Sequence, residues 1–183
     1  MKDYFSDLKK FLKNKYTVII HEEVLYNIEV DKILGFEVNS EVKNVYRHYK
    51  IFDLVWLHNN KCIGEVHFVS YKNLEREHNE LEGIMRKFYD VKWDRYSIVQ
   101  DIKNWYPLFK FNNGDAFCLD IRNGRVVLYE HEVFDVGKNL HGLTIAKSLN
   151  DLFDKWGHIH FKNVYYWDEI CDEDGIDIDS ELD

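Results

Sequence analysis

Four side chains near the middle of the sequence could perform chemistry: Asp115, Cys118, Asp120 and His131. Paired carboxylates can hold a metal ion, and a cysteine beside a histidine can act as a nucleophile. Asp115 and Asp120 are five residues apart, however, so in one strand their side chains point to opposite faces. We therefore expect structural roles for both. Asp120 would pair with the neighbouring Arg122, and Asp115 would hydrogen-bond the backbone of a turn.

The cysteine and the histidine do not complete a catalytic site in the sequence. Cys118 is expected in mid-strand, where a free cysteine is usually a small buried apolar residue. No loop that could form an oxyanion hole accompanies it, so we expect no catalytic residue and no enzyme. The three cysteines, Cys62, Cys118 and Cys171, lie far apart, which favours reduced thiols over a disulfide or zinc framework.

Two segments near the C-terminus have some features of metal sites. His158 and His160 would lie on one face of a strand and could bind a metal. No further ligand lies at a suitable spacing, so a partly exposed terminal strand is the better interpretation. Residues 170–181 are similar in part to a calcium-binding loop, but Ile170 occupies the first ligand position. We therefore predict no metal and no cofactor.

The residues with chemical potential lie in a stretch that has a strong β-hairpin pattern. Two Asn-Gly pairs, Asn113-Gly114 and Asn123-Gly124, are each flanked by runs that alternate apolar with polar residues. Asn-Gly favours the type I′ turn of a two-residue hairpin loop. The pattern predicts a three-stranded meander over residues 106–112, 115–122 and 125–131.

A two-residue loop also fixes the register of the second hairpin. It pairs Arg122 with Arg125 and Leu119 with Leu128. The face that carries Leu119 is apolar enough to lie on the core. The face that carries Cys118 is mixed, and any chemistry of the hairpin would have to occur there.

This hairpin resembles the motif of the SUKH superfamily, which includes fungal cell-wall-synthesis regulators and many bacterial immunity proteins. The motif has a Gly-Asp turn, a second aspartate on the next strand and a tight turn, and the matching positions are Gly114, Asp115, Asp120 and Gly124. Upstream, Leu34-Gly35 matches the end of the family's first helix. The resemblance covers most of residues 23–157, and it implies an α+β domain that binds proteins.

The remaining pattern predicts the elements around the meander. Amphipathic spacing predicts helices over residues 3–16, 23–34, 40–49, 73–89 and 149–156. Strand-like runs cover residues 51–57 and 62–71, and residues 17–20 could be a strand or a buried linker. We predict a single α+β domain over residues 1–161, with a mainly antiparallel or mixed sheet of five or six strands and helices packed on it. Residues 162–183 would form an acidic C-terminal extension.

The acidity of the chain is concentrated in this extension. The net charge of the chain is −9. Residues 162–183 contain nine acidic residues and one lysine and so contribute −8, which leaves −1 for residues 1–161. An acidic tail disfavours nucleic acid as a partner and favours a basic protein, although a solvated tail that maintains solubility is the alternative. Aromatic residues beside the acids could anchor a partner or could pack on the core. The predicted contact residues are Tyr166, Trp167, Asp168, Asp172, Glu173, Asp174, Asp177 and Asp179.

These features favour a non-enzymatic protein-binding module. The resemblance implies an immunity protein that binds and neutralises a polymorphic toxin, most often a nuclease with a basic surface. The alternative is a regulatory or scaffold protein that acts through protein contacts without a toxin partner. No apolar run is long enough for a membrane span or a secretory signal, so we expect a cytoplasmic protein with no membrane partner. The sequence leaves the oligomeric state open.

Overall fold

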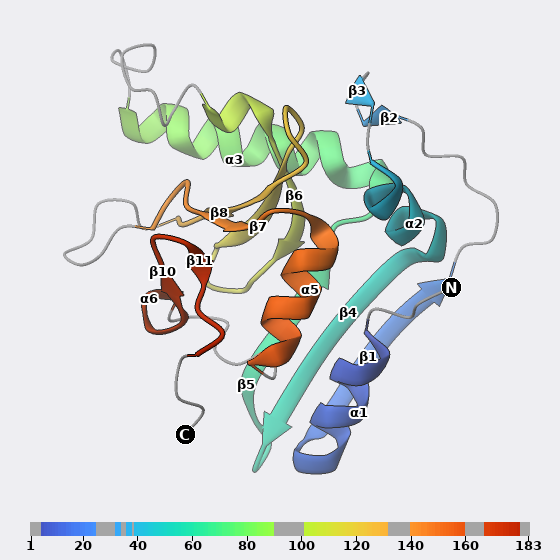
Figure 1. The fold of residues 1–183 in the computed structure, drawn as a ribbon. Helices are drawn as coiled ribbons and strands as arrows, with labels where there is room; N and C mark the ends of the chain where they lie inside the picture. The colour runs from blue at the N-terminus through green and yellow to red at the C-terminus, as the bar shows by residue number, and fades with distance from the viewer. Residues whose placement is uncertain are drawn as a thin grey trace.

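The protein is a single α+β domain built on one antiparallel sheet (Figure 1). The computed structural model describes residues 5–24, 32–33, 36–37, 39–89, 101–131, 140–159 and 167–179. The sheet has seven strands in the order β1-β4-β5-β6-β7-β8-β9, and every neighbouring pair is antiparallel. This confirms the predicted fold class, with more strands than the five or six expected.

The sheet strands are β1 (Thr17–Val24), β4 (Tyr49–His58), β5 (Lys61–Phe68), β6 (Trp105–Lys110), β7 (Ala116–Asp120), β8 (Val126–Tyr129) and β9 (Thr144–Ala146). The helices are α1 (Ser6–Lys15), α2 (Ser40–His48), α3 (Leu74–Tyr89), α5 (Leu149–His158) and α6 (Trp167–Ile170), with 3₁₀ turns η1 (Tyr71–Asn73) and η3 (Ile102–Asn104). Two short hairpins lie outside the sheet, formed by β2 (Lys32–Ile33) with β3 (Phe36–Glu37) and by β10 (Cys171–Asp172) with β11 (Gly175–Ile176). No helix among the described residues is long and apolar enough to cross a membrane.

Helices pack against both faces of the sheet and bury two cores. On one face, α1, α2 and α5 enclose the larger core, in which Phe5 stacks on Phe52 with ring centroids 3.8 Å apart and meets Phe153 edge to face. On the other face, α3 covers only the part of the sheet near β6, β7 and β8, where Leu81 and Met85 contact a smaller core. We call this second face the outer face. On the outer face, no described helix covers strands β1, β4 and β5 (Figure 1).

Helix boundaries follow local capping signals where these exist. The Ser148 hydroxyl accepts a hydrogen bond from the Asp151 amide and begins α5 at Leu149, the first residue of the predicted helix. The Asn39 side chain does the same for α2 through the Val42 amide. The predicted helix over residues 23–34 is wrong at both ends, because β1 continues through Val24 and residues 32–33 form a strand; residues 25–31 lie outside the described part. Pairing with β4 along the whole of β1 outweighs the local helical periodicity.

The loops of the meander differ from the predicted type I′ turns. Among the described residues, only Asn59 and Asn60 are non-glycine residues with positive φ, at 49° and 62°, and these form the turn between β4 and β5. At the two Asn-Gly pairs only the glycines have positive φ. The Asp120 amide donates to the Arg125 carbonyl, so the second loop is longer than two residues and Leu119 pairs with Val126 instead of Leu128.

The register error is two residues, and a shift of two leaves each side chain on its predicted face. Phe117 and Leu119 lie in the larger core, whereas Ala116 and Cys118 lie under α3. The division of the hairpin into two faces is therefore confirmed although the pairing is not.

Candidate functional site

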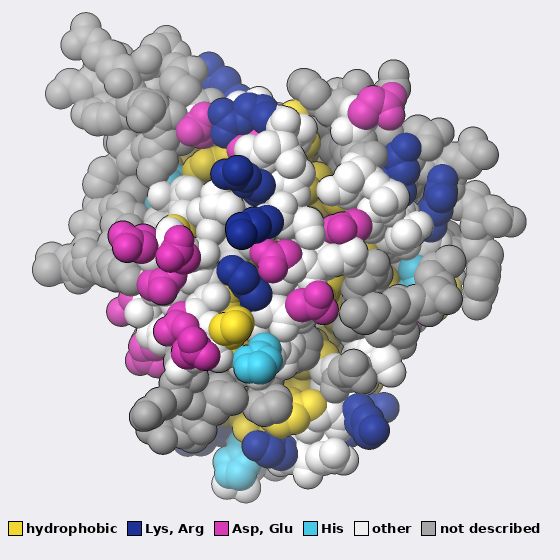
Figure 2. All heavy atoms as spheres, viewed as in Figure 1, with side chains coloured by type: hydrophobic (Ala, Val, Ile, Leu, Met, Phe, Trp, Pro, Cys, Tyr) yellow, Lys and Arg dark blue, Asp and Glu magenta, His cyan; other side chains and the backbone are white. Residues whose placement is uncertain are grey.

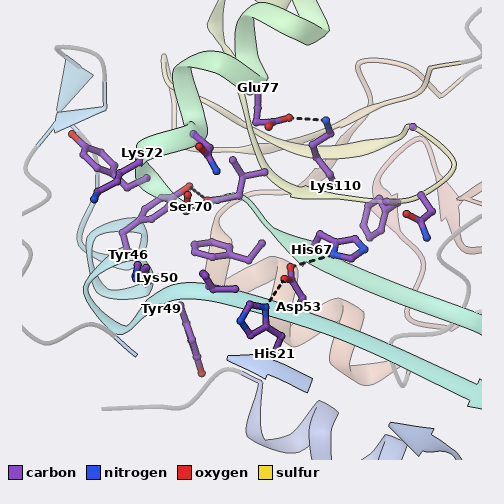
Figure 3. A pocket seen from close by; sticks show the side chains of 18 residues that line it. His21, Tyr46, Tyr49, Lys50, Asp53, His67, Ser70, Lys72, Glu77 and Lys110 are labelled. Carbon is purple, nitrogen blue, oxygen red and sulfur yellow. Dashed lines mark hydrogen bonds and ion pairs between the residues drawn. The ribbon is translucent and has the colours of Figure 1, made fainter. Parts of the chain in front are cut away.

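A concavity of the described surface lies on the outer face, beside the N-terminal end of α3. Its volume is about 960 Å³, and Ile51, Val69 and Tyr71 give it an apolar lining (Figure 3). The walls come from the segment that enters α3 and from the β6–β7 loop. A concave apolar site of this size that also holds polar groups is a common form of binding site.

A row of histidine, aspartate and lysine side chains crosses the sheet along this groove. The strand registers place His21 beside Asp53, Asp53 beside His67, and His67 beside Lys110. The Asp53 carboxylate lies 3.1 Å from His67 Nδ1 and 3.4 Å from His21 Nδ1 (Figure 3). The other ring nitrogen of His67, Nε2, is 3.2 Å from the buried Glu65 carboxylate. Carboxylates therefore occupy both nitrogens of His67, which leaves it poorly suited to act on a substrate.

A second ion pair forms the opposite wall of the groove. Lys110 Nζ lies 2.6 Å from a Glu77 oxygen, and Arg76 binds the other oxygen of Glu77 at 2.6 Å. Burial opposes the ionisation of Glu77, but hydrogen bonds from Lys110 and Arg76 outweigh it and lower the pKa of this carboxyl. Asp53, Glu77 and Lys110 thus each contact another charged or titratable side chain of the groove. No three His, Cys, Asp or Glu side chains of the described residues gather to hold a metal.

Asp115 connects three distant parts of the chain. One carboxylate oxygen accepts hydrogen bonds from the His131 amide at 3.0 Å and approaches the His131 ring at 2.9 Å. The other accepts from the Trp167 indole at 2.9 Å and from the Asn113 side chain at 2.6 Å. Asp115 is 5% exposed. It therefore joins the β6–β7 turn to the end of β8 and to the C-terminal segment, a wider structural role than the turn contact predicted.

Asp120 forms the local charge pair that the sequence predicted. Its carboxylate accepts hydrogen bonds from the Arg122 backbone amide at 3.0 Å and from the Arg122 guanidinium at 2.6 Å. Arg122 also contacts Asp101 at 2.5 Å. Hydrogen bonding to Asp120 and then to Asp101 raises the pKa of Arg122. The two aspartates of the hairpin thus bind different partners, as their spacing requires.

The structure does not assemble the Cys118–His131 pair into a nucleophilic site. Cys118 is fully buried beneath α3 and pairs with Val127, and burial raises the pKa of its thiol. His131 instead contacts Asp115. The other predicted histidine pair is also separate, because His158 ends α5 instead of lying in a strand, and His160 lies outside the described residues.

The C-terminal acids are presented by a folded segment. We call residues 167–179 the C-terminal unit; its buried side chains are Trp167, Ile170, Cys171 and Ile176. Gly175 lies so close to β9 that an added Cβ would be 2.6 Å from the Ile145 carbonyl oxygen. The predicted acids Asp168, Asp172, Glu173, Asp174 and Asp179 are exposed and Asp177 is half-buried. Figure 2 shows acidic side chains gathered over this part of the molecule.

Two aromatic residues, Tyr166 and Trp167, were predicted to anchor a partner at this surface, with packing on the core as the alternative. Trp167 is 2% exposed and packs on Phe111 and Phe117, with its indole hydrogen-bonded to Asp115, so the prediction of an exposed anchor is wrong. A tryptophan ring beside a large core is more stable when it is buried and its N–H is hydrogen-bonded than when it is exposed to solvent. Tyr166 lies outside the described residues.

His141 lies beside the end of β8 and is buried. Its burial makes the free energy of unfolding depend on pH. Burial lowers the pKa of His141 from 6.5 to about 4, whereas the unfolded chain protonates it near 6.5. The unfolded state therefore binds more protons in this window, and stability falls as the pH falls through it. Between about pH 7.5 and pH 5 we expect this residue to reduce the free energy of unfolding by about 2 kcal/mol. Urea unfolding at both pH values measures this change. For His141→Gln the free energy of unfolding should change by about 2 kcal/mol less between the two pH values than for the wild type. For His58→Gln, at an exposed position, the change should equal that of the wild type.

Comparison with known proteins gives one weak relative. The chain is 25% identical over 159 residues to the SPbeta prophage-derived uncharacterized protein YokK of Bacillus subtilis (strain 168), and the match covers 79% of each chain. No protein-family model matches the chain. No solved structure matches it either. The resemblance of the hairpin to the SUKH superfamily therefore stays a prediction.

The groove is the feature that sequence reasoning missed. His21, Asp53 and His67 are separated by more than 10 residues along the chain, and they meet only because β1, β4 and β5 are neighbours in this register. Because successive side chains of a strand point to opposite faces, the sequences of β1 and β4 could have assigned each side chain to a face of the sheet. Nothing in the sequence gave the order of the strands.

Proposed function

We propose that the protein is a non-enzymatic protein-binding module whose C-terminal unit contacts a basic partner, and that this partner is a toxin neutralised by the contact. The observation that carries the proposal is the fixed display of acids by the C-terminal unit. Its apolar residues are buried, its tryptophan is bound to Asp115, and most of its carboxylates face solvent. Charges held on an ordered segment steer a partner without a further entropy cost of ordering the segment.

The charge distribution of the chain supports the same partner. Residues 1–161 are nearly neutral, so the electrostatic field outside the protein comes mainly from the C-terminal end. A nuclease toxin must bind nucleic acid through basic residues, and an acidic surface can attract and cover them. The SUKH resemblance of the hairpin points to the same class of function. The regulatory or scaffold alternative uses the same surface with a partner that is not a toxin.

Neutralisation of the acidic surface is the sharpest test of this proposal. The test variant carries Asp168→Asn, Glu169→Gln, Glu173→Gln and Asp174→Asn. The control variant carries four neutralised acids elsewhere on the surface, Glu37→Gln, Glu75→Gln, Glu80→Gln and Asp154→Asn. Both have the same net charge, so a difference between them reports position. Each is co-expressed with the toxin domain encoded by the neighbouring gene, and growth is measured.

We expect the wild type and the control variant to restore growth and the test variant to fail. With purified proteins, association of the test variant with the toxin domain should be at least about tenfold slower at low salt, and it should depend less on salt. Equal protection by the two variants would contradict the acidic contact. Failure of the wild type to protect, or the absence of a toxin gene, would favour the scaffold alternative.

A further inference from the structure

The two edges of the sheet differ in how they are protected. At one edge, β9 has three residues and the C-terminal unit lies against it through Gly175 and β11. At the other edge, β1 has eight residues, and no strand of the described chain pairs with its outer side. A strand edge presents a row of backbone donors and acceptors that can pair with another chain. The β1 edge is thus the open edge of this fold.

The side chains of β1 do little to discourage such pairing. Proteins commonly protect an edge with lysine, proline, a bulge or a very short strand. β1 has no lysine or proline, and its register is irregular only at its last step, between Glu23 and Val24. Its two glutamates are paired within the monomer, Glu22 with Lys9 at 2.9 Å and Glu23 with Lys50, and the His21 ring contacts Asp53.

Exposed apolar surface lies at the same edge. Ile19 is 55% exposed, which is the largest value for a large hydrophobic residue in the described chain. It lies near the middle of β1 on the outer face, beside Val55 of β4. A strand added along β1 would cover Ile19 on the side away from Val55.

We propose that β1 pairs antiparallel with β1 of a second copy of this chain, with Ile19 facing Ile19 of the second copy. In this register Val18 faces Ile20, and Thr17 faces His21. Each pair joins residues of the same face, so the outer faces of the two sheets become continuous. The most exposed apolar side chain then contacts its own equivalent, and an isologous contact of this kind closes as a dimer.

The distribution of charge favours a second copy as the occupant of the edge. Two chains of net charge −9 repel each other, but the acids of the C-terminal unit lie beside β9, at the opposite edge of the sheet from β1, and residues 1–161 carry only −1 (Figure 1). Pairing through β1 brings the nearly neutral ends together and keeps the two acidic surfaces far apart. The dimer would display one C-terminal unit at each end. This proposal does not depend on the identity of any other partner.

Sedimentation velocity over a concentration series tests the proposal with the full chain. We expect a monomer–dimer equilibrium for the wild type and a dissociation constant at least about tenfold higher for Ile19→Lys, because a charge replaces the facing isoleucines. Ile178→Lys is the matched control, since Ile178 is 44% exposed but lies in the C-terminal unit, and it should leave the equilibrium unchanged. Because Ile19 is exposed, the variant should keep the wild-type circular dichroism spectrum.

A cross-linking experiment tests the register. Facing residues of an antiparallel pair lie within the Cα separation that a disulfide allows. Ile19→Cys in a Cys62→Ser background should form a covalent dimer under mild oxidation, whereas Ile178→Cys in the same background should not. A wild type that sediments as a monomer throughout the series, a dimer that Ile19→Lys leaves intact, or the absence of the disulfide would overturn the proposal.

Discussion

Asp115→Ala is expected to lower the free energy of unfolding by about 3 kcal/mol, because it leaves the buried Trp167 indole and two part-buried donors without their acceptor. The Trp167 indole and the His131 amide both donate to this carboxylate, and the residue is 5% exposed, so water cannot replace it without rearrangement. Urea denaturation followed by tryptophan fluorescence would measure the loss.

The same substitution should also loosen the C-terminal unit. Trp167 lies in that unit, so the substitution removes the hydrogen bond that connects the unit to the β6–β7 turn. Amide hydrogen exchange over residues 167–179 should therefore become faster than in the wild type. Asp168→Ala removes an exposed carboxylate nearby and should change stability by less than about 0.5 kcal/mol. If Asp115→Ala unfolds at the same urea concentration as Asp168→Ala, the role of Asp115 as the connecting residue is wrong.

Gly64→Ala is the second substitution with a large expected effect. Gly64 pairs with Trp56 across β4 and β5, and the Trp56 ring lies over it so closely that an added Cβ would be 2.1 Å from Cζ2. Trp56 is 6% exposed and packs in the larger core, so the ring cannot move without disturbing its neighbours. We expect a loss of about 3 kcal/mol in the free energy of unfolding, the upper part of the range for overpacked cores.

A second glycine offers a matched control. An alanine at Gly83 in α3 would meet no atom within 4 Å, so Gly83→Ala should stabilise the protein, by about 0.5–1 kcal/mol, through helix propensity. Combining Gly64→Ala with Trp56→Leu should cost less than the sum of the two single changes, since the smaller side chain leaves room for the methyl group. Additive losses would show that the contact between Gly64 and Trp56 is not the cause.

Gly64 lies within the strand-like run of residues 62–71, and the sequence does not show why a glycine is needed there. A glycine in a strand-like run predicts either a bulge or a close approach of another group. The structure has both, because the β4–β5 register shifts next to Trp56 and the indole ring occupies the space of the missing side chain. Only the pairing of the two strands identifies the group that requires the glycine.

The hairpin shows how far the local pattern can be read. Alternation of apolar and polar residues gave the strands of the meander and the face of each side chain correctly. The turns were predicted wrongly because Asn-Gly suits several loop types, and hydrogen bonds such as that from the Asp120 amide to the Arg125 carbonyl select a longer loop. An error of two residues in register is invisible to a pattern whose period is two.

The sequence by itself determined the α+β class, four of the five helices predicted from amphipathic spacing, the spacing that separates Asp115 from Asp120, and the concentration of acid at the C-terminal end. These are properties of neighbouring residues. The tertiary structure decided that Trp167 is buried, that His21, Asp53 and His67 form one row, and that β1 is an open edge. The physical reason is that strand order and long-range packing depend on contacts between residues far apart in the chain, and local propensity does not specify them.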